Sequence, residues 1–200
     1  MAPNRIMRGG TMRRALLLAM AAVATAAALV ACGSGGGGTT TAVPDKAADA
    51  EVLDGVLARQ MAAIKAYDHS LRALGGQALA AARLFRAQEQ EHVDAILKAL
   101  RGLGAKAEPT PETIDSGGLK TEEEYLVFLY EVESATIDTE LSAISNLSDA
   151  WPRSLLASTV ANQAQHLVLL RRALGAKPLE TVPEPFENGT ALAPQGMIAQ

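Results

Sequence analysis

The chain has 200 residues, of which 48% are hydrophobic but only 4% aromatic. This composition favours helix over strand, in a chain long enough to form one domain with a buried core. The formal net charge of −4 is unevenly distributed: four arginines and no acidic residue precede Cys32, so the rest of the chain carries 14 Lys and Arg against 22 Asp and Glu, an acidic balance that argues against nucleic-acid binding.

Residues 1–31 have the layout of a secretory signal peptide. Arg13 and Arg14 form a basic start, and an apolar, alanine-rich run follows from Ala15 to Val30. A run of this length also suits an uncleaved membrane-spanning helix, but the residues at its end favour cleavage. The sequence therefore predicts an exported protein and leaves open the export route and the start codon.

The apolar run ends in Leu29-Val30-Ala31-Cys32, which resembles the lipobox of bacterial lipoproteins. Cys32 is the only cysteine, so the chain cannot form an internal disulfide, and the residue is free for acylation, for example with palmitate. Residues 32–46 are rich in Gly and Thr and suit a flexible tether. We therefore expect a lipid anchor on Cys32 that holds the protein on the extracytoplasmic side of the cell membrane.

Residues 47–176 carry the pattern of four amphipathic helices. Apolar residues recur at alternating spacings of four and three, which is typical of the core stripe of a helix bundle. Glycines and a Thr-x-x-Glu capping box mark the expected helix ends. The predicted helices cover residues 47–74, 77–103, 121–147 and 152–174.

Polar residues interrupt each apolar stripe near its middle. Buried carboxylates and imidazoles are costly unless they are paired or bind a metal ion. Four coincident interruptions therefore indicate one shared polar layer. The interrupting residues are Gln60 in the first helix, Glu89 and His92 in the second, Glu133 in the third, and Gln163 and His166 in the fourth.

The four helices are predicted to form two similar hairpins. Gln60 precedes Glu89-x-x-His92 at nearly the same interval at which Glu133 precedes Gln163-x-x-His166. Between the hairpins, residues 105–120 can extend over about 50 Å, which exceeds the roughly 40 Å length of a predicted helix. We therefore expect a long crossover between helices 2 and 3.

This arrangement resembles the ferritin-like di-iron carboxylate proteins, in which two helices each supply a Glu and two supply Glu-x-x-His. Glu89-x-x-His92 matches one motif and Glu133 matches one single Glu, whereas Gln60 and Gln163 stand where the family has Glu. The sequence looks most like the ferritin-like domains of actinobacterial exported proteins. The resemblance implies an all-α, ferritin-like four-helix bundle.

The resemblance also implies which residues serve each metal position. Residues 89 and 163 would lie between two metals. His92 and the residue at position 60 would serve one of them, and Glu133 and His166 would serve the other.

The two glutamines lower the negative charge of this site. Only Glu89 and Glu133 remain, and two carboxylates neutralise one divalent ion, so we expect little or no di-iron oxidase or ferroxidase activity. Two interpretations stay open. Glu89, His92, Glu133 and His166 bind a single Fe, Mn or Zn ion, which such N and O ligands suit, or they form a vestigial, metal-free polar layer in a helical scaffold that binds a protein partner.

Several other polar or aromatic residues receive simpler interpretations. Glu140, one heptad beyond Glu133, is interpreted either as an outer partner of the site or, more simply, as a boundary residue, and Tyr67 and Tyr130 as core aromatics. Residues 177–200 are Pro-rich and are expected to be irregular. The sequence identifies no protein partner and leaves a homo-oligomer open.

Overall fold

The computed structural model describes residues 43–110 and 112–182, and these form four helices and no strand, which confirms the predicted all-α class. The helices are α1 (Lys46–Ser70), α2 (Gly76–Leu103), α3 (Glu122–Asn146) and α4 (Ala150–Ala173). No helix among the described residues has the length and apolarity needed to span a membrane. The predicted signal peptide, Cys32, most of the tether and the tail beyond residue 182 lie outside the described residues.

Side chains cap the start of three helices. Asp45 accepts hydrogen bonds from two N–H groups in the first turn of α1, and Asp149 caps α4, with Pro152 in its first turn as predicted. Thr121 and Glu124 form the predicted capping box of α3. Each cap satisfies N–H groups that have no partner within the helix.

Glycines end two of the helices as predicted. Gly104 after α2 and Gly175 after α4 have φ angles of +80° and +89°, a left-handed conformation that glycine adopts without a Cβ clash. The end of α1 differs from the prediction, because the helix stops at Ser70 rather than Leu74. Leu74 is buried within the turn that follows, so its position in the apolar stripe reflects burial and not helix.

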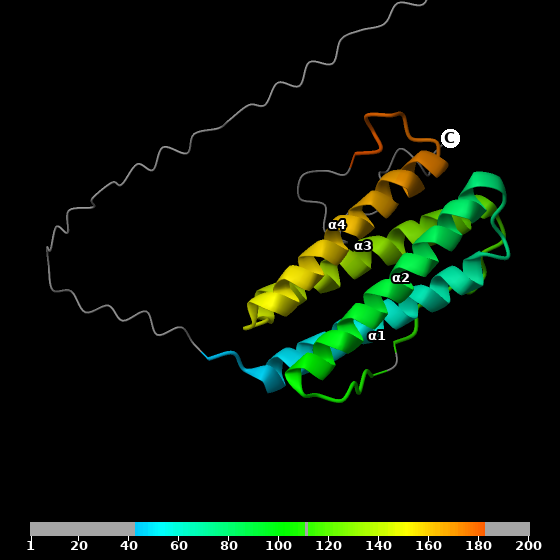
Figure 1. Ribbon diagram of the computed structural model, residues 1–200. Coiled ribbons are helices and arrows are strands. Elements are labelled where there is room, and N and C mark those ends of the chain that lie inside the picture. The colour runs from blue at the N-terminus through cyan, green and yellow to red at the C-terminus, as the bar shows by residue number, and fades with distance from the viewer. Residues whose placement is uncertain (1–42, 111, 183–200) are drawn as a thin grey trace, which may run out of the picture. The chain divides into compact units, whose positions relative to one another are not determined.

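The four helices pack as two antiparallel hairpins, α1 with α2 and α3 with α4 (Figure 1). The hairpins meet through two further contacts, in which α1 packs against α3 and α2 against α4, the second being less extensive. All four helices therefore border one common interior.

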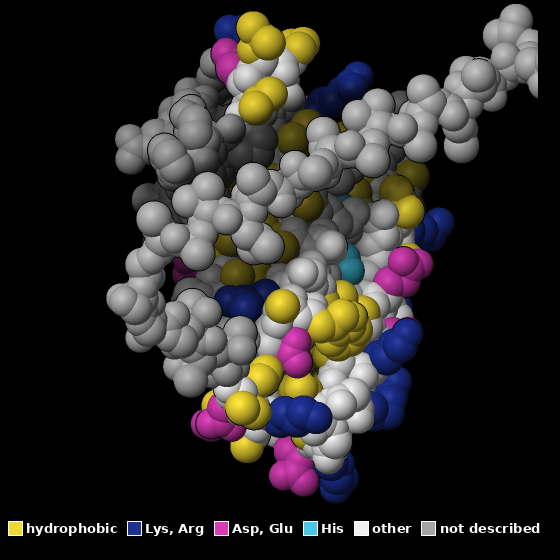
Figure 2. Space-filling model, turned by 60° about the vertical axis from the view of Figure 1, so that its left-hand side comes forward, with side chains coloured by type: hydrophobic (Ala, Val, Ile, Leu, Met, Phe, Trp, Pro, Cys, Tyr) yellow, Lys and Arg dark blue, Asp and Glu magenta, His cyan; other side chains and the backbone are white. Residues whose placement is uncertain are grey.

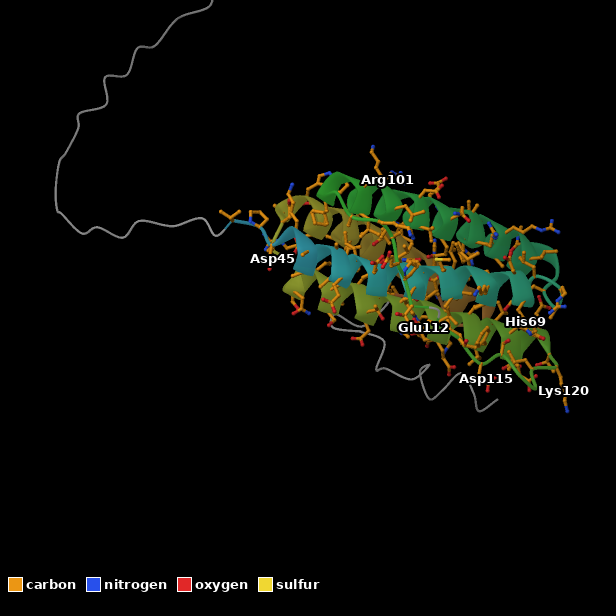
Figure 3. All side chains as sticks on the ribbon, turned by 90° about the horizontal axis from the view of Figure 1, so that it is seen from below. Asp45, His69, Arg101, Glu112, Asp115 and Lys120 are labelled. Carbon is orange, nitrogen blue, oxygen red and sulfur yellow. The ribbon has the colours of Figure 1, made fainter. Side chains whose placement is uncertain are left out.

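The segment 104–121 crosses the length of the bundle, as predicted. The N–H of Glu108 donates to the carboxylate of Asp54 at 3.0 Å, and further along, Arg59 forms an ion pair with Glu112 at 2.6 Å. Both contacts are to α1, and Figure 3 shows the segment passing beside this helix. The long crossover between α2 and α3 is thus confirmed.

The apolar core consists of two clusters, and the polar interruptions lie close to where these clusters meet. On the outside, Figure 2 shows acidic, basic and hydrophobic side chains interspersed over the visible face. The largest buried residues of the first cluster are Tyr67, Phe85, Leu129, Tyr130 and Leu167. Those of the second are Leu53, Leu57, Ile96, Leu100 and Leu156.

The first residues beyond α4 pack back onto the bundle. Arg171 is buried on α4 and donates to the hydroxyl of Tyr130 at 2.9 Å. Its guanidinium also donates to the backbone carbonyls of Glu180 and Val182. A buried arginine therefore ties the short segment after α4 to the α3–α4 hairpin.

Candidate metal centre

All six residues that interrupt the apolar stripes are buried, with 9% exposure or less. They enter the interior from all four helices, because each occupies an inward-facing position of the stripe. Five of them are essentially inaccessible at 0–1% exposure, and only His92 is more exposed, at 9%. The polar groups thus have only one another and their close neighbours as partners.

Three of the predicted ligands, Glu89, Glu133 and His166, come together from α2, α3 and α4. One ligand atom from each lies within 4.8 Å of the others. Nδ1 of His166 is 3.0 Å from Oε1 of Glu133 and 3.5 Å from Oε1 of Glu89. Two carboxylates and one imidazole nitrogen therefore converge on a single point of the core.

Several oxygens in this region have no hydrogen-bond donor among the described residues. They are Oε1 of Glu89, Oε2 of Glu133, and the amide oxygens of Gln60 and Gln163. A buried acceptor without a donor costs about 1–3 kcal/mol, and more when it is charged. Oε1 of Glu89 has only the 3.5 Å ion pair with Nδ1 of His166, and a cation bound between the two carboxylates would supply the missing partner, so these atoms fit a bound metal ion.

His92 lies beside this group rather than within it. Its Nδ1 is 3.3 Å from Oε2 of Glu89, the oxygen that also receives a hydrogen bond from Gln163 at 3.4 Å. The side chain of His92 retains 11% exposure, against 2% for His166. Of the four predicted ligands, the structure thus converges three and leaves His92 on the outer side of Glu89.

Three neighbours hold the converging ligands in place. The hydroxyl of Tyr67 donates a short hydrogen bond to Glu133. The amide oxygen of Gln88 lies 2.8 Å from Nε2 of His166, and the ring of Phe85 stacks on this imidazole at a centroid distance of 4.0 Å. Tyr67 is a core aromatic, as predicted, but it also contacts the site.

The sequence gives unequal signals for these neighbours. Tyr67 lies one heptad beyond Gln60 in the same stripe, so its contact with the polar layer was within reach of the spacing argument. Gln88 lies outside the stripe that contains Glu89, and glutamines on helix surfaces are common. Nothing in the sequence distinguishes it.

The two carboxylates of the site have opposite pKa shifts. Burial would raise the pKa of Glu89, but contacts with His166 and His92 outweigh it and hold this pKa below its ordinary value. Burial and the negative charge of Glu89 raise the pKa of Glu133, against the opposing contacts with His166 and Tyr67. Glu89 is therefore the more acidic of the pair, and Glu133 holds a proton more readily.

The imidazoles are stabilised in their charged form. Burial lowers the pKa of His166, but its contacts with Glu133 and Glu89 raise it to about 9. Burial also lowers the pKa of His92, and its contact with Glu89 more than compensates. In the absence of a metal, a protonated His166 supplies the positive charge between the two carboxylates.

Glu140 belongs to a second group of polar side chains in the same core. It is fully buried at 0% exposure, so of its two interpretations the boundary residue was wrong, and the position behind the polar layer is the one that the structure fits. Gln60 and Thr159 each donate a hydrogen bond to it at 2.7 Å, one to each carboxylate oxygen. Burial raises the pKa of Glu140 to about 7, although both hydrogen bonds oppose the shift.

The charge and donor types of the site suit one divalent ion better than two. Glu89 and Glu133 together balance a single 2+ charge, and His166 adds a neutral nitrogen ligand once it is deprotonated. Gln60 and Gln163 contribute no charge, and Glu140 is already bonded through both oxygens. A mixed oxygen and nitrogen set of this kind is compatible with Mn, Fe and Zn ions.

Two solved structures share this architecture. A ferritin-like, diiron-carboxylate protein from Bacillus anthracis is 22% identical, with a TM-score of 0.55, over 66% of this chain and 98% of its own. A conserved hypothetical protein from Mycobacterium tuberculosis is 16% identical, with a TM-score of 0.60, over 70% of this chain and 97% of its own. At these identities the similarity shows the fold.

The match to a family is more extensive than either pairwise identity. No curated protein matches the sequence. The model of the ferritin-like domain family, however, matches residues 47–176, which include every residue of the candidate centre and all four helices apart from Lys46 at the start of α1. The chain therefore belongs to the ferritin-like domain family.

Proposed function

We propose that this protein is an exported, membrane-anchored ferritin-like lipoprotein that binds one divalent metal ion in the core of its bundle. One observation carries the metal part of the proposal. Ligand atoms of Glu89, Glu133 and His166 converge within 4.8 Å, and both carboxylates have a buried oxygen without a hydrogen-bond donor among the described residues.

The unpaired oxygens favour a bound ion over a purely structural role. In a layer that only fixes the helix register, each buried acceptor would be matched by a donor. The ion, as proposed, lies between Glu89, Glu133 and His166, and the amide oxygen of Gln163 is available as a neutral fourth ligand. Metal storage, sensing and scavenging are all compatible with such a site.

The metal-free scaffold is the second candidate, and specific contacts favour it. The amide nitrogens of Gln60 and Gln163 donate to Glu140 and Glu89, and a protonated His166 pairs with Glu133. These contacts offset part of the negative charge without a metal. The two candidates differ in one measurable property, which is whether metal ions stabilise the fold.

Metal content and thermal stability test the proposal directly. Protein purified without a chelator is analysed for metal and then melted with and without Mn(II), Fe(II) or Zn(II). An ion that binds only the folded state stabilises it by about 2.7 kcal/mol at a hundredfold excess over its dissociation constant. The absence of any shift at millimolar ion would overturn the metal proposal.

Variants of two of the three histidines in the chain supply a matched comparison. His166→Ala removes the proposed ligand and should abolish the metal-dependent shift. His69→Ala removes a histidine whose ring contacts Arg72 and Tyr125 away from the site, and it should leave the shift intact. A shift lost with His69 would assign the binding to the surface.

The membrane part of the proposal depends on Cys32, which follows the apolar run in a lipobox-like context. Cys32→Ser should release the protein from membranes or block its processing, because the described helices include none able to span a membrane. Fractionation of cells and mass analysis of the N-terminus check this expectation. A correctly cleaved Cys32→Ser protein that remains in the membrane fraction would overturn the lipid anchor.

A further inference from the structure

Gln88 connects the ligand group to the edge of the bundle. It is half-buried on α2, immediately before Glu89. Its amide oxygen lies 2.8 Å from Nε2 of His166, whose opposite nitrogen, Nδ1, points to Glu133 and Glu89. Gln88 thus contacts the site through the far side of a proposed ligand.

The position of the His166 ring leaves it little freedom. Phe85 stacks on one of its faces at 4.0 Å with an interplanar angle of 20°, and the ring is buried between α2 and α3 partners. An amide oxygen only accepts hydrogen bonds. In this orientation Nε2 must therefore carry the hydrogen, and the remaining lone pair of the neutral ring is on Nδ1.

We propose that Gln88 is a positioning residue that holds His166 with Nε2 protonated and Nδ1 directed at the ion, an inference that rests on the proposed metal site. The hydrogen bond on the far nitrogen of a ligating histidine fixes its tautomer and its orientation. Here a neutral amide from the helix that carries Glu89 performs this role.

The opposite orientation of the same amide would give the opposite chemistry. If the amide nitrogen of Gln88 faced His166, Nε2 would have to accept, and the single proton of the neutral ring would occupy Nδ1. That nitrogen could not bind an ion. The two arrangements therefore differ in which nitrogen of His166 carries the proton, and this difference can be measured.

The experiment compares zinc binding and imidazole ¹⁵N spectra of the full chain and three variants. Gln88→Leu removes the acceptor, Gln88→Glu retains one, and Gln165→Leu changes an exposed glutamine on α4 that donates to the carbonyl of Ala161 on its own helix. Gln88→Leu should weaken zinc binding roughly 10- to 100-fold, while the other two variants stay close to wild type.

The spectra separate positioning from general damage to the fold. In the zinc-loaded wild type, His166 should show Nδ1 as the metal-bound nitrogen and Nε2 with a slowly exchanging proton. In Gln88→Leu that proton should exchange at least tenfold faster, and in Gln88→Glu its slow exchange should return.

Each negative result has a distinct meaning. Equal zinc affinity in wild type and Gln88→Leu, or zinc on Nε2 of His166 in the wild type, would overturn the role of Gln88 alone. A wild type that takes up no zinc, manganese or iron would overturn the proposed metal site and this role with it.

Discussion

Glu133 and Glu140 lie two helical turns apart on the same face of α3, and both are buried at 1% exposure or less. Their surroundings nevertheless differ. Glu140 receives one hydrogen bond on each oxygen, from Gln60 and Thr159. Glu133 receives its hydrogen bonds on Oε1 only, from Tyr67 and His166, and its Oε2 has no partner among the described residues.

This difference separates a structural polar group from a candidate binding site. Burial alone does not separate the two, because both carboxylates are shielded from water. The position of the unpaired atoms does separate them. Glu133 and Glu89 each have an oxygen without a hydrogen-bond partner among the described residues, and a ligand atom of each lies within 4.8 Å of the other and of His166. A closed hydrogen-bond set needs no ligand, whereas two convergent carboxylates that each have an oxygen without a hydrogen-bond donor are completed by one.

The sharpest test exchanges one carboxylate in each group. Glu133→Gln should weaken metal binding by more than about a hundredfold, which exceeds the usual cost of disturbing a ligand's outer partner. Glu140→Gln should change the affinity only slightly. Calorimetric titration of both variants with Zn(II) or Mn(II) measures the contrast.

The stability of the metal-free variants provides the control. Glu133→Gln should be as stable as wild type or more so, because burial and Glu89 already raise the pKa of Glu133 and the amide removes a desolvated charge. Equal metal-dependent melting shifts in Glu133→Gln and wild type would contradict the assignment of the site to this level of the core.

The sequence contains the information for the fold and for the level of the site. Apolar spacing locates the helices, and its interruption at Gln60, Glu89, Glu133 and Gln163 locates the polar residues, because an inward-facing position is a property of periodicity. The same argument explains why the first helix was predicted to continue past Ser70 to Leu74. Leu74 is buried in the turn, and its spacing matches that of the apolar stripe.

The periodicity of the sequence does not predict how deeply a polar side chain is buried or which groups form hydrogen bonds with it. Glu140 follows the stripe of α3, but the spacing does not say that Gln60 and Thr159 would cover both of its oxygens. Gln88 lies outside the apolar stripe, so the spacing argument does not identify it at all. Both depend on how neighbouring helices are shifted along one another, which the packing of the whole core decides.

Glu140 with its two donors, Gln60 and Thr159, is here called the closed group. The pH dependence of stability should distinguish it from the group formed by Glu89, Glu133 and His166. The pKa of Glu140 is about 7 in the folded protein, against about 4.3 in an unfolded chain. The folded state therefore binds the proton more tightly, and its stabilisation is complete below pH 4 and lost as the pH rises to 7. This change amounts to roughly 2–3 kcal/mol between pH 4.5 and pH 8.

A matched variant isolates this contribution from the other shifted groups. Glu133 and the imidazoles of His92 and His166 also have raised pKa values, and Glu89 has a lowered one. The difference between wild type and Glu140→Gln in metal-free buffer cancels their effects. The variant should gain stability at pH 8 and none at pH 4.5. A constant difference in urea unfolding across this range would contradict a titrating Glu140.

The smallest expected effect concerns a single donor of the closed group. Thr159→Val keeps the shape of the side chain but removes the hydroxyl that bonds Oε2 of Glu140 at 2.7 Å. An unmatched buried oxygen should then destabilise the fold by about 1–2 kcal/mol at pH 8, and by less at pH 5, where Glu140 is protonated.

Metal affinity should be unaffected by the same change, because Thr159 bonds Glu140 and not the converging ligands. Ser158→Ala is the matched control, since its exposed hydroxyl donates to the carbonyl of Ser154 on the same helix, and it should shift the free energy of unfolding by less than about 0.5 kcal/mol. If Thr159→Val lowered stability and metal affinity together, the two groups would act as one network. The contrast between Glu133 and Glu140 would then be one of degree, with the closed group supporting the open one.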